Sequence, residues 1–104
     1  MIKIIFLHNS NQEVEFVSIK GHANSAPYPH DLVCAGVSAI TLGAINALEN
    51  DKDFEIVVKE GLVEIKVIKK PTLHDQIVLS VLESQLQSLA SSYKENIRLE
   101  RKSS

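Results

Sequence analysis

The stretch FEIVVKEGLVEIKVI, residues 54–68, gives the clearest indication of the fold in this sequence. Apolar residues alternate with polar ones on both sides of Glu60-Gly61, and a period of two is typical of strands with one buried face. A two-residue turn that contains glycine joins such runs into a β-hairpin. The hairpin is predicted to set three apolar residues of each strand against one another: Phe54, Ile56 and Val58 against Val63, Ile65 and Val67.

The first twenty residues predict another hairpin. The runs IKIIFL (residues 2–7) and VEFVSIK (residues 14–20) are rich in β-branched and aromatic residues, and HNSNQE between them favours a turn. In the second run the apolar spacing changes phase between Phe16 and Val17, which indicates a bulge or extra twist. Near the C-terminus, NIRLER (residues 96–101) alternates and predicts a closing strand.

A helix is expected between the two hairpins. Residues 21–30 contain two prolines, a glycine and an asparagine, and they are predicted to form a loop. Asp31 is then a favourable N-cap for a helix from Leu32 to about Leu48. The apolar residues of this helix recur at helical spacing and predict a buried stripe: Val33, Val37, Ile40, Ala44 and Leu48.

A second helix follows the hairpin of residues 54–68. Pro71 ends the hairpin, Thr72 is the predicted N-cap, and Asp75 in the first turn suits the helix dipole. Its predicted buried stripe is Val78, Leu82, Leu86 (or Gln85), Leu89 and Tyr93. The order of elements is therefore ββαββαβ, an α+β fold of two hairpins, two helices and a closing strand, with the helices on one face of a mainly antiparallel sheet. Residues 1–104 are predicted to form a single domain.

Composition narrows the possible partners and the compartment. The net charge is −2 and the pI is near 6.0, so the sequence shows no basic excess of the kind that binds nucleic acid. One cysteine excludes an intramolecular disulfide and fits a reducing compartment, and no stretch is long and apolar enough to span a membrane. We expect a cytoplasmic protein without a membrane or direct nucleic-acid partner.

Cys34 is the candidate nucleophile. With Asp31 as N-cap, its thiol lies in the first helical turn, where free N–H groups and the helix dipole stabilise a thiolate. The same N–H groups, from about Leu32 to Cys34, point to where an oxyanion forms during acyl transfer. His22, at the end of the predicted strand, is the candidate general base for a Cys-His dyad, and His30 is the rival base.

Other interpretations of these residues remain open. A lone cysteine on an apolar helix is often a small buried side chain, and Asp31 needs no role beyond capping. Zinc is a further alternative, with His22, His30, Asp31 and Cys34 as ligands, although their spacing matches no familiar zinc motif.

The segments GHA (residues 21–23) and DLVCAGVSAI (residues 31–40) resemble the ribosomal-processing cysteine protease family, Prp. GLVEIKV (residues 61–67) and LES (residues 82–84) agree in order, so the resemblance covers essentially the whole chain. It implies a cytoplasmic homodimer without a cofactor. It also implies a substrate, the precursor of large-subunit ribosomal protein number twenty-seven, from which the protease removes a short N-terminal extension after a pair of aromatic residues.

The resemblance assigns roles to individual residues. Cys34 is the implied nucleophile and His22 the implied general base, Asp31 and Ser38 support the site, and Gly21 shapes the backbone beside the histidine.

The sequence departs from the family pattern in the loop. Asn24 and Ser25 stand where a glycine and an aromatic residue are expected, and Pro29 stands in place of a glycine. These departures leave the cleavage sequence of the substrate open. The alternative to a protease is a non-catalytic ribosome-assembly module that holds a peptide, in which Cys34 is an ordinary thiol.

Overall fold

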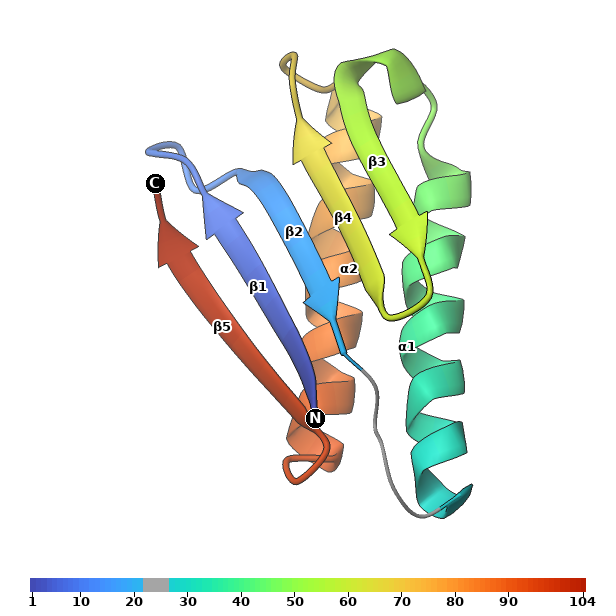
Figure 1. The fold of residues 1–104 in the computed structure, drawn as a ribbon. Coiled ribbons are helices and arrows are strands. Elements are labelled where there is room, and N and C mark those ends of the chain that lie inside the picture. Colours follow the sequence, from blue (N-terminus) through green and yellow to red (C-terminus); the bar gives the residue numbers. More distant parts are fainter. Residues whose placement is uncertain (22–26) are drawn as a thin grey trace.

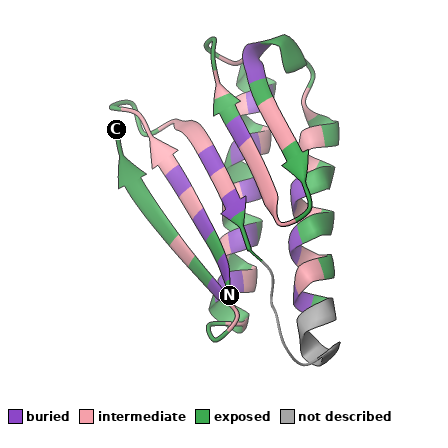
Figure 2. Cartoon of the chain, viewed as in Figure 1, coloured by how far each residue is buried: buried purple, intermediate pink, exposed green. Residues whose placement is uncertain are grey.

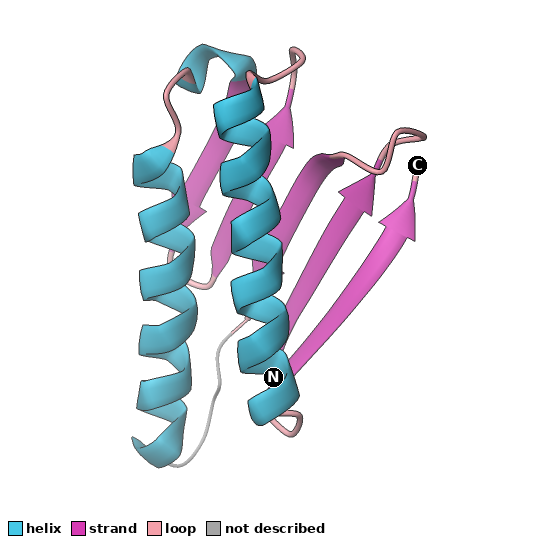
Figure 3. Ribbon diagram, turned by 180° about the vertical axis from the view of Figure 1, so that it is seen from behind, coloured by secondary structure: helices cyan, strands magenta, loops and turns pink. Residues whose placement is uncertain are grey.

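The computed structural model describes residues 1–21 and 27–104, with residues 27–31 as backbone only. Five strands form one mixed sheet in the order β3-β4-β2-β1-β5, and both long helices cover the same face of that sheet (Figures 1 and 3). The elements are β1 (Ile2–His8), β2 (Val14–Lys20), α1 (Pro27–Ala47), the short 3-10 helix η1 (Asp51–Asp53), β3 (Phe54–Lys59), β4 (Leu62–Val67), α2 (Leu73–Ser92) and β5 (Ile97–Ser103). The predicted α+β class and the ββαββαβ order are confirmed.

The hairpin of β3 and β4 has the predicted register. Phe54 pairs with Val67, and the pairs Ile56 with Ile65 and Val58 with Val63 follow, so the apolar residues lie opposite one another. The turn is Glu60-Gly61, where Gly61 has a φ of 75° that residues with a side chain rarely adopt. This hairpin joins the first one through β4, which pairs antiparallel with β2.

The first hairpin contains the predicted irregularity. Leu7 pairs with Phe16, but the next residue, His8, pairs with Val14, so Glu15 has no partner of its own in β1. This β-bulge explains the change of phase in the apolar spacing of β2. The closing strand β5 ends two residues beyond its predicted range, at Ser103. It pairs parallel with β1, whereas the other three strand pairs are antiparallel.

The predicted start of α1 is wrong. The helix begins at Pro27 rather than at Leu32, and Asp31 lies one turn inside it instead of capping it. Proline is tolerated in the first turn of a helix because the N–H groups of that turn have no intrahelical partner. Pro27 and Pro29 therefore belong to the first turn of α1 and do not mark a loop. The preceding residues 22–26 lie outside the described part of the chain.

The core lies between the sheet and the two helices (Figure 2). Alternate residues of β1 are buried together with Leu79, Leu82 and Leu86 of α2, so the predicted α2 stripe is confirmed at Leu82 and Leu86 and is joined by Leu79. In α1, Val33 and Val37 are buried as predicted, while the later members of the stripe, Ile40, Ala44 and Leu48, pack against the core and are only partly buried. The helices approach closely at Gly36, where an added Cβ would lie 3.2 Å from Leu89.

The start of α2 is held by the predicted cap. The Thr72 side chain accepts a hydrogen bond from the Asp75 N–H at 3.2 Å. Asp75 itself is fully buried and has a further role, because its carboxylate accepts hydrogen bonds from the backbone N–H groups of Glu49 (2.8 Å) and Asn50 (3.1 Å). It thus ties the chain after α1 to the first turn of α2. No helix in the described residues is long and apolar enough to cross a membrane.

Candidate active site

A cavity of about 600 Å³ lies between α1, the start of β1, the end of β2, and the turn between β3 and β4. Its wall on the helix side is one face of α1, where Cys34, Ser38 and Thr41 recur at helical spacing. Opposite them lie Ile2 and Ile19 of the sheet. The cavity is thus formed by segments that are far apart in the sequence, and it contains the only thiol of the chain.

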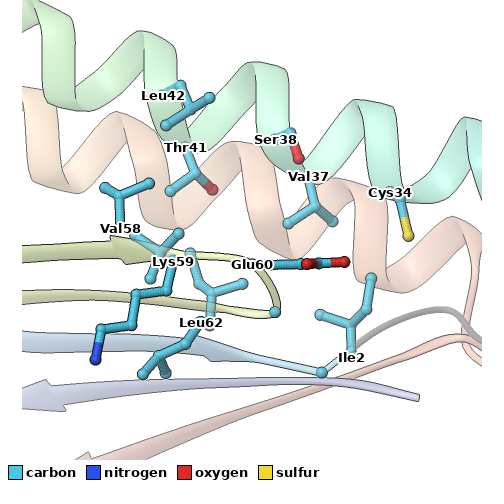
Figure 4. A pocket seen from close by; sticks show the side chains of 14 residues that line it. Ile2, Cys34, Val37, Ser38, Thr41, Leu42, Val58, Lys59, Glu60 and Leu62 are labelled. Carbon is cyan, nitrogen blue, oxygen red and sulfur yellow. The ribbon is translucent and has the colours of Figure 1, made fainter.

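The helix presents its thiol and hydroxyl groups to this cavity (Figure 4). Cys34 is half-buried and in no disulfide, and its sulfur points away from the helix axis toward the cavity. Ser38, one turn later, is exposed and lines the same wall. A thiol that is partly accessible inside a concave site is positioned to react with a bound ligand, whereas a fully buried core cysteine is not.

Gly21 closes the end of the cavity and cannot be another residue without strain. Its φ is +103°, and a Cβ built on it would lie 2.5 Å from the carbonyl oxygen of Met1. Its N–H donates a hydrogen bond of 2.9 Å to the carbonyl oxygen of Gly61, which fixes the β3–β4 turn against the end of β2. Gly21 therefore shapes the backbone at the point where the chain leaves the sheet toward residue 22.

The described residues include only part of the predicted site. The structure brings Gly21, Cys34 and Ser38 together around one cavity. His22 lies outside the described residues, as do Asn24 and Ser25, so the predicted pairing of His22 with Cys34 is untested. Three further positions, Pro29, the rival base His30 and Asp31, are described as helical backbone without side chains, which leaves the alternative zinc site untested as well.

Because α1 begins at Pro27, the predicted oxyanion hole at Leu32–Cys34 is wrong in this conformation. The free N–H groups of a helix are those of its first turn, and Cys34 lies about two turns further on. The N–H groups at positions 32–34 bond to carbonyl oxygens of the preceding turn. Any donor that stabilises an oxyanion beside Cys34 must therefore come from another part of the cavity.

A separate cluster of ionisable groups lies at the other end of the helices. Ligand atoms of Glu49, His74 and Asp75 lie within 4.8 Å of one another. Burial would raise the pKa of Asp75, but hydrogen bonds from the Glu49 N–H, His74 and the Asn50 N–H outweigh it and hold that pKa below its ordinary value of 3.8. The hydrogen bond to Asp75 raises the pKa of His74 above 6.5. The cluster is explained by its role in holding the turn after α1.

Comparison with known proteins identifies the family. The family model described as cysteine protease Prp matches residues 1–98. The chain belongs to the Prp family of ribosomal-processing cysteine proteases.

Relatives agree along nearly the whole chain. The ribosomal processing cysteine protease Prp of Staphylococcus aureus is 32% identical over 103 residues, which cover 95% of this chain and 97% of the relative. The Prp of Mycoplasma genitalium is 35% identical over 98 residues, which cover 93% of this chain and 92% of the relative.

Solved structures of a Prp protease share the fold. S. aureus Prp with a covalently linked product peptide superposes with a TM-score of 0.87 at 32% identity, covering 98% of this chain and 100% of that one. The same protease with a substrate peptide gives a TM-score of 0.80 at 29% identity, with the same coverage. This member of the Prp family is accordingly a cysteine protease.

Several cavity residues of this Prp protein were not predicted as site residues from the sequence. Lys59, Glu60 and Leu62 line the cavity because the β3–β4 turn folds against Gly21. That contact depends on tertiary packing, and no local sequence pattern predicts it. Thr41 could have been predicted from the sequence, since it lies two helical turns after Cys34 and therefore on the same face of α1.

Proposed function

We propose that this protein removes the N-terminal extension from the precursor of large-subunit ribosomal protein number twenty-seven, with Cys34 as the nucleophile. The observation that carries the proposal is the half-buried Cys34 thiol in a peptide-sized cavity, on a chain of the Prp family. The structure of S. aureus Prp with a covalently linked product peptide supports covalent chemistry at such a site.

His22 is the proposed general base. It directly follows Gly21, which lines the cavity that contains Cys34. In the proposed mechanism the imidazole takes the thiol proton and the sulfur attacks the peptide carbonyl carbon. The C–N bond then breaks as the imidazolium donates that proton to the leaving amine, and water hydrolyses the resulting thioester. No cofactor or metal takes part in these steps.

Ser38 is the proposed oxyanion donor, and Asp31 a supporting residue. The Ser38 hydroxyl faces the cavity one turn from Cys34 (Figure 4), and a hydroxyl at that position can donate a hydrogen bond to a negatively charged oxygen. Asp31 does not cap α1, because the helix begins at Pro27. We include Asp31 in the proposal as a residue that orients His22.

The test is the cleavage of the precursor ribosomal protein from the same organism, read as intact masses. The native protein should yield one N-terminally truncated product, and the Cys34→Ala and His22→Ala variants should leave the precursor whole. If the native protein binds the precursor without cleaving it, the non-catalytic assembly module becomes the better account. If Cys34→Ala cleaves as fast as the native protein, the assignment of the nucleophile is wrong.

We also propose that the protein is a cytoplasmic homodimer, as the resemblance to Prp implies. A shallow apolar groove between the outer faces of α1 and α2 supports the dimer, because Ile77 and Val81 on its rim are 54% and 48% exposed. Sedimentation should give twice the chain mass of 11.5 kDa, and Val81→Lys should give the single chain. A native protein that sediments as the single chain would contradict the dimer.

A further inference from the structure

Thr41 is a buried side chain with an unsatisfied hydroxyl. Its exposed fraction is 1%, and among the described residues its Oγ1 has no hydrogen-bond partner. A helical threonine usually donates to a carbonyl oxygen of the preceding turn, but Thr41 does not. Buried polar groups nearly always have a partner, so an exception calls for a specific reason.

The hydroxyl belongs to the cavity wall. Thr41 lines the same cavity as Cys34 and Ser38, and Figure 4 shows its oxygen directed from α1 toward the space above the sheet. Its neighbours at this end of the cavity are the apolar side chains of Leu42 and Val58. The hydroxyl is thus a buried polar group flanked by apolar side chains, an arrangement that selects a polar atom of a bound ligand at this point of the wall.

The position of Thr41 relative to Cys34 fits a peptide subsite. Seven residues of α-helix separate them by about 10 Å along the helix axis. An extended peptide advances about 3.4 Å per residue, so a peptide that lies along α1 with its scissile bond at Cys34 places its third residue from that bond beside Thr41.

We infer that Thr41 is a specificity-determining residue, whose hydroxyl hydrogen-bonds a polar group of the substrate about three residues from the cleaved bond. This inference rests on the proposed function, because it takes the peptide to be cleaved at Cys34. Without substrate the hydroxyl remains unpaired and costs stability. With substrate it gains its partner, so the same group that destabilises the free protein favours the correct peptide.

The decisive variant is Thr41→Val, which replaces the hydroxyl by a methyl group of similar size. It is expected to unfold at a higher urea concentration than the native protein, because an unpaired buried hydroxyl has been removed. Its KM for a peptide that spans the cleavage site should rise about tenfold, with kcat within about twofold of native. Thr41→Ser, which restores the hydroxyl, should return KM to within about threefold of native.

A measurement of peptide binding tests this inference independently of the proposed cleavage activity. The Kd of the same peptide is measured for Cys34→Ala and for Cys34→Ala with Thr41→Val, and the second should be about tenfold weaker whether or not the native protein cleaves. The polar residues of the peptide are then replaced one at a time by alanine. One replacement, about three residues from the scissile bond, should abolish the difference in Kd between the two variants.

Cleavage by the native protein together with equal Kd values overturns the inference alone. Absence of both cleavage and binding overturns the inference and the proposed function together. A lower urea midpoint for Thr41→Val would also overturn the inference, since it would show that the hydroxyl already has a partner in the free protein.

Discussion

Replacement of Gly21 by alanine tests how the structure shapes the end of the cavity. The alanine Cβ would lie 2.5 Å from the Met1 carbonyl oxygen, and the φ of +103° would become a strained conformation. The obstacle is backbone, so a side-chain rotation cannot relieve it. Strained backbone of this kind costs about 1–3 kcal/mol, and the forced shift of β1 adds to it, so we expect Gly21→Ala to destabilise the protein by about 3 kcal/mol.

Urea unfolding followed by circular dichroism measures this difference. With a slope of about 1.5 kcal/mol per molar urea, 3 kcal/mol lowers the midpoint by about 2 M. Gly43→Ala is the matched control, because a Cβ there meets nothing within 4 Å and glycine inside a helix costs about 1 kcal/mol relative to alanine. The control should therefore raise the midpoint. A Gly21→Ala protein as stable as the native one would refute the reasoning.

Three further predictions concern the site and the stability of the fold. Ser38→Ala should lower kcat at least about tenfold with an unchanged urea midpoint, since Ser38 is exposed; an unchanged kcat would exclude it as the oxyanion donor. Asp75→Ala should destabilise the protein by about 3 kcal/mol in urea unfolding, because the Glu49 and Asn50 N–H groups lose their acceptor; a native midpoint would contradict that role. The pH dependence has two limbs. Because the pKa of Asp75 is lowered in the folded protein, its carboxylate stabilises the fold above pH 3.8. This stabilisation is lost as the pH falls through the lowered pKa. Because the pKa of His74 is raised in the folded protein, its imidazolium stabilises the fold below pH 6.5. This stabilisation is lost as the pH rises through the raised pKa. Urea midpoints between pH 2 and 9 should show both losses, and His74→Ala should remove the alkaline one; an alkaline loss that persists in this variant would exclude His74 as its source.

The strands and the second helix could be predicted from the sequence because local chemistry determines them. The alternation in residues 54–68 gave the register of β3 and β4, and the change of phase before Val17 reported the bulge at Glu15. Thr72 caps α2 as its position predicted. The parallel pairing of β5 with β1 was not predicted, since strand order depends on contacts between distant segments.

The start of α1 shows where local rules conflict. Pro27 and Pro29 favour a loop if they precede the helix, and they are compatible with a helix if they occupy its first turn. Asp31 is an equally good cap in the first case and an ordinary helical residue in the second. The sequence pattern alone does not decide between these alternatives, so the predicted cap and the predicted oxyanion donors failed together.

The candidate site was predictable in part. Cys34 and Ser38 share the cavity face because four residues are about one turn of helix, and Gly21 was expected to shape the backbone there. The contribution of the β3–β4 turn was not predictable, because it depends on the hydrogen bond from the Gly21 N–H to Gly61. The unpaired state of the Thr41 hydroxyl likewise becomes visible only once its neighbours are placed.

The most direct test of the central claim is to find the acyl-enzyme on Cys34. The protein is mixed with the precursor, quenched in acid within the first turnover, and its intact mass is measured. The account predicts a species heavier by the mass of the cleaved extension less one water, located by fragmentation to the peptide that contains Cys34, the only cysteine in the chain. Precursor cleavage without this adduct, or an adduct that persists in Cys34→Ala, would contradict the account.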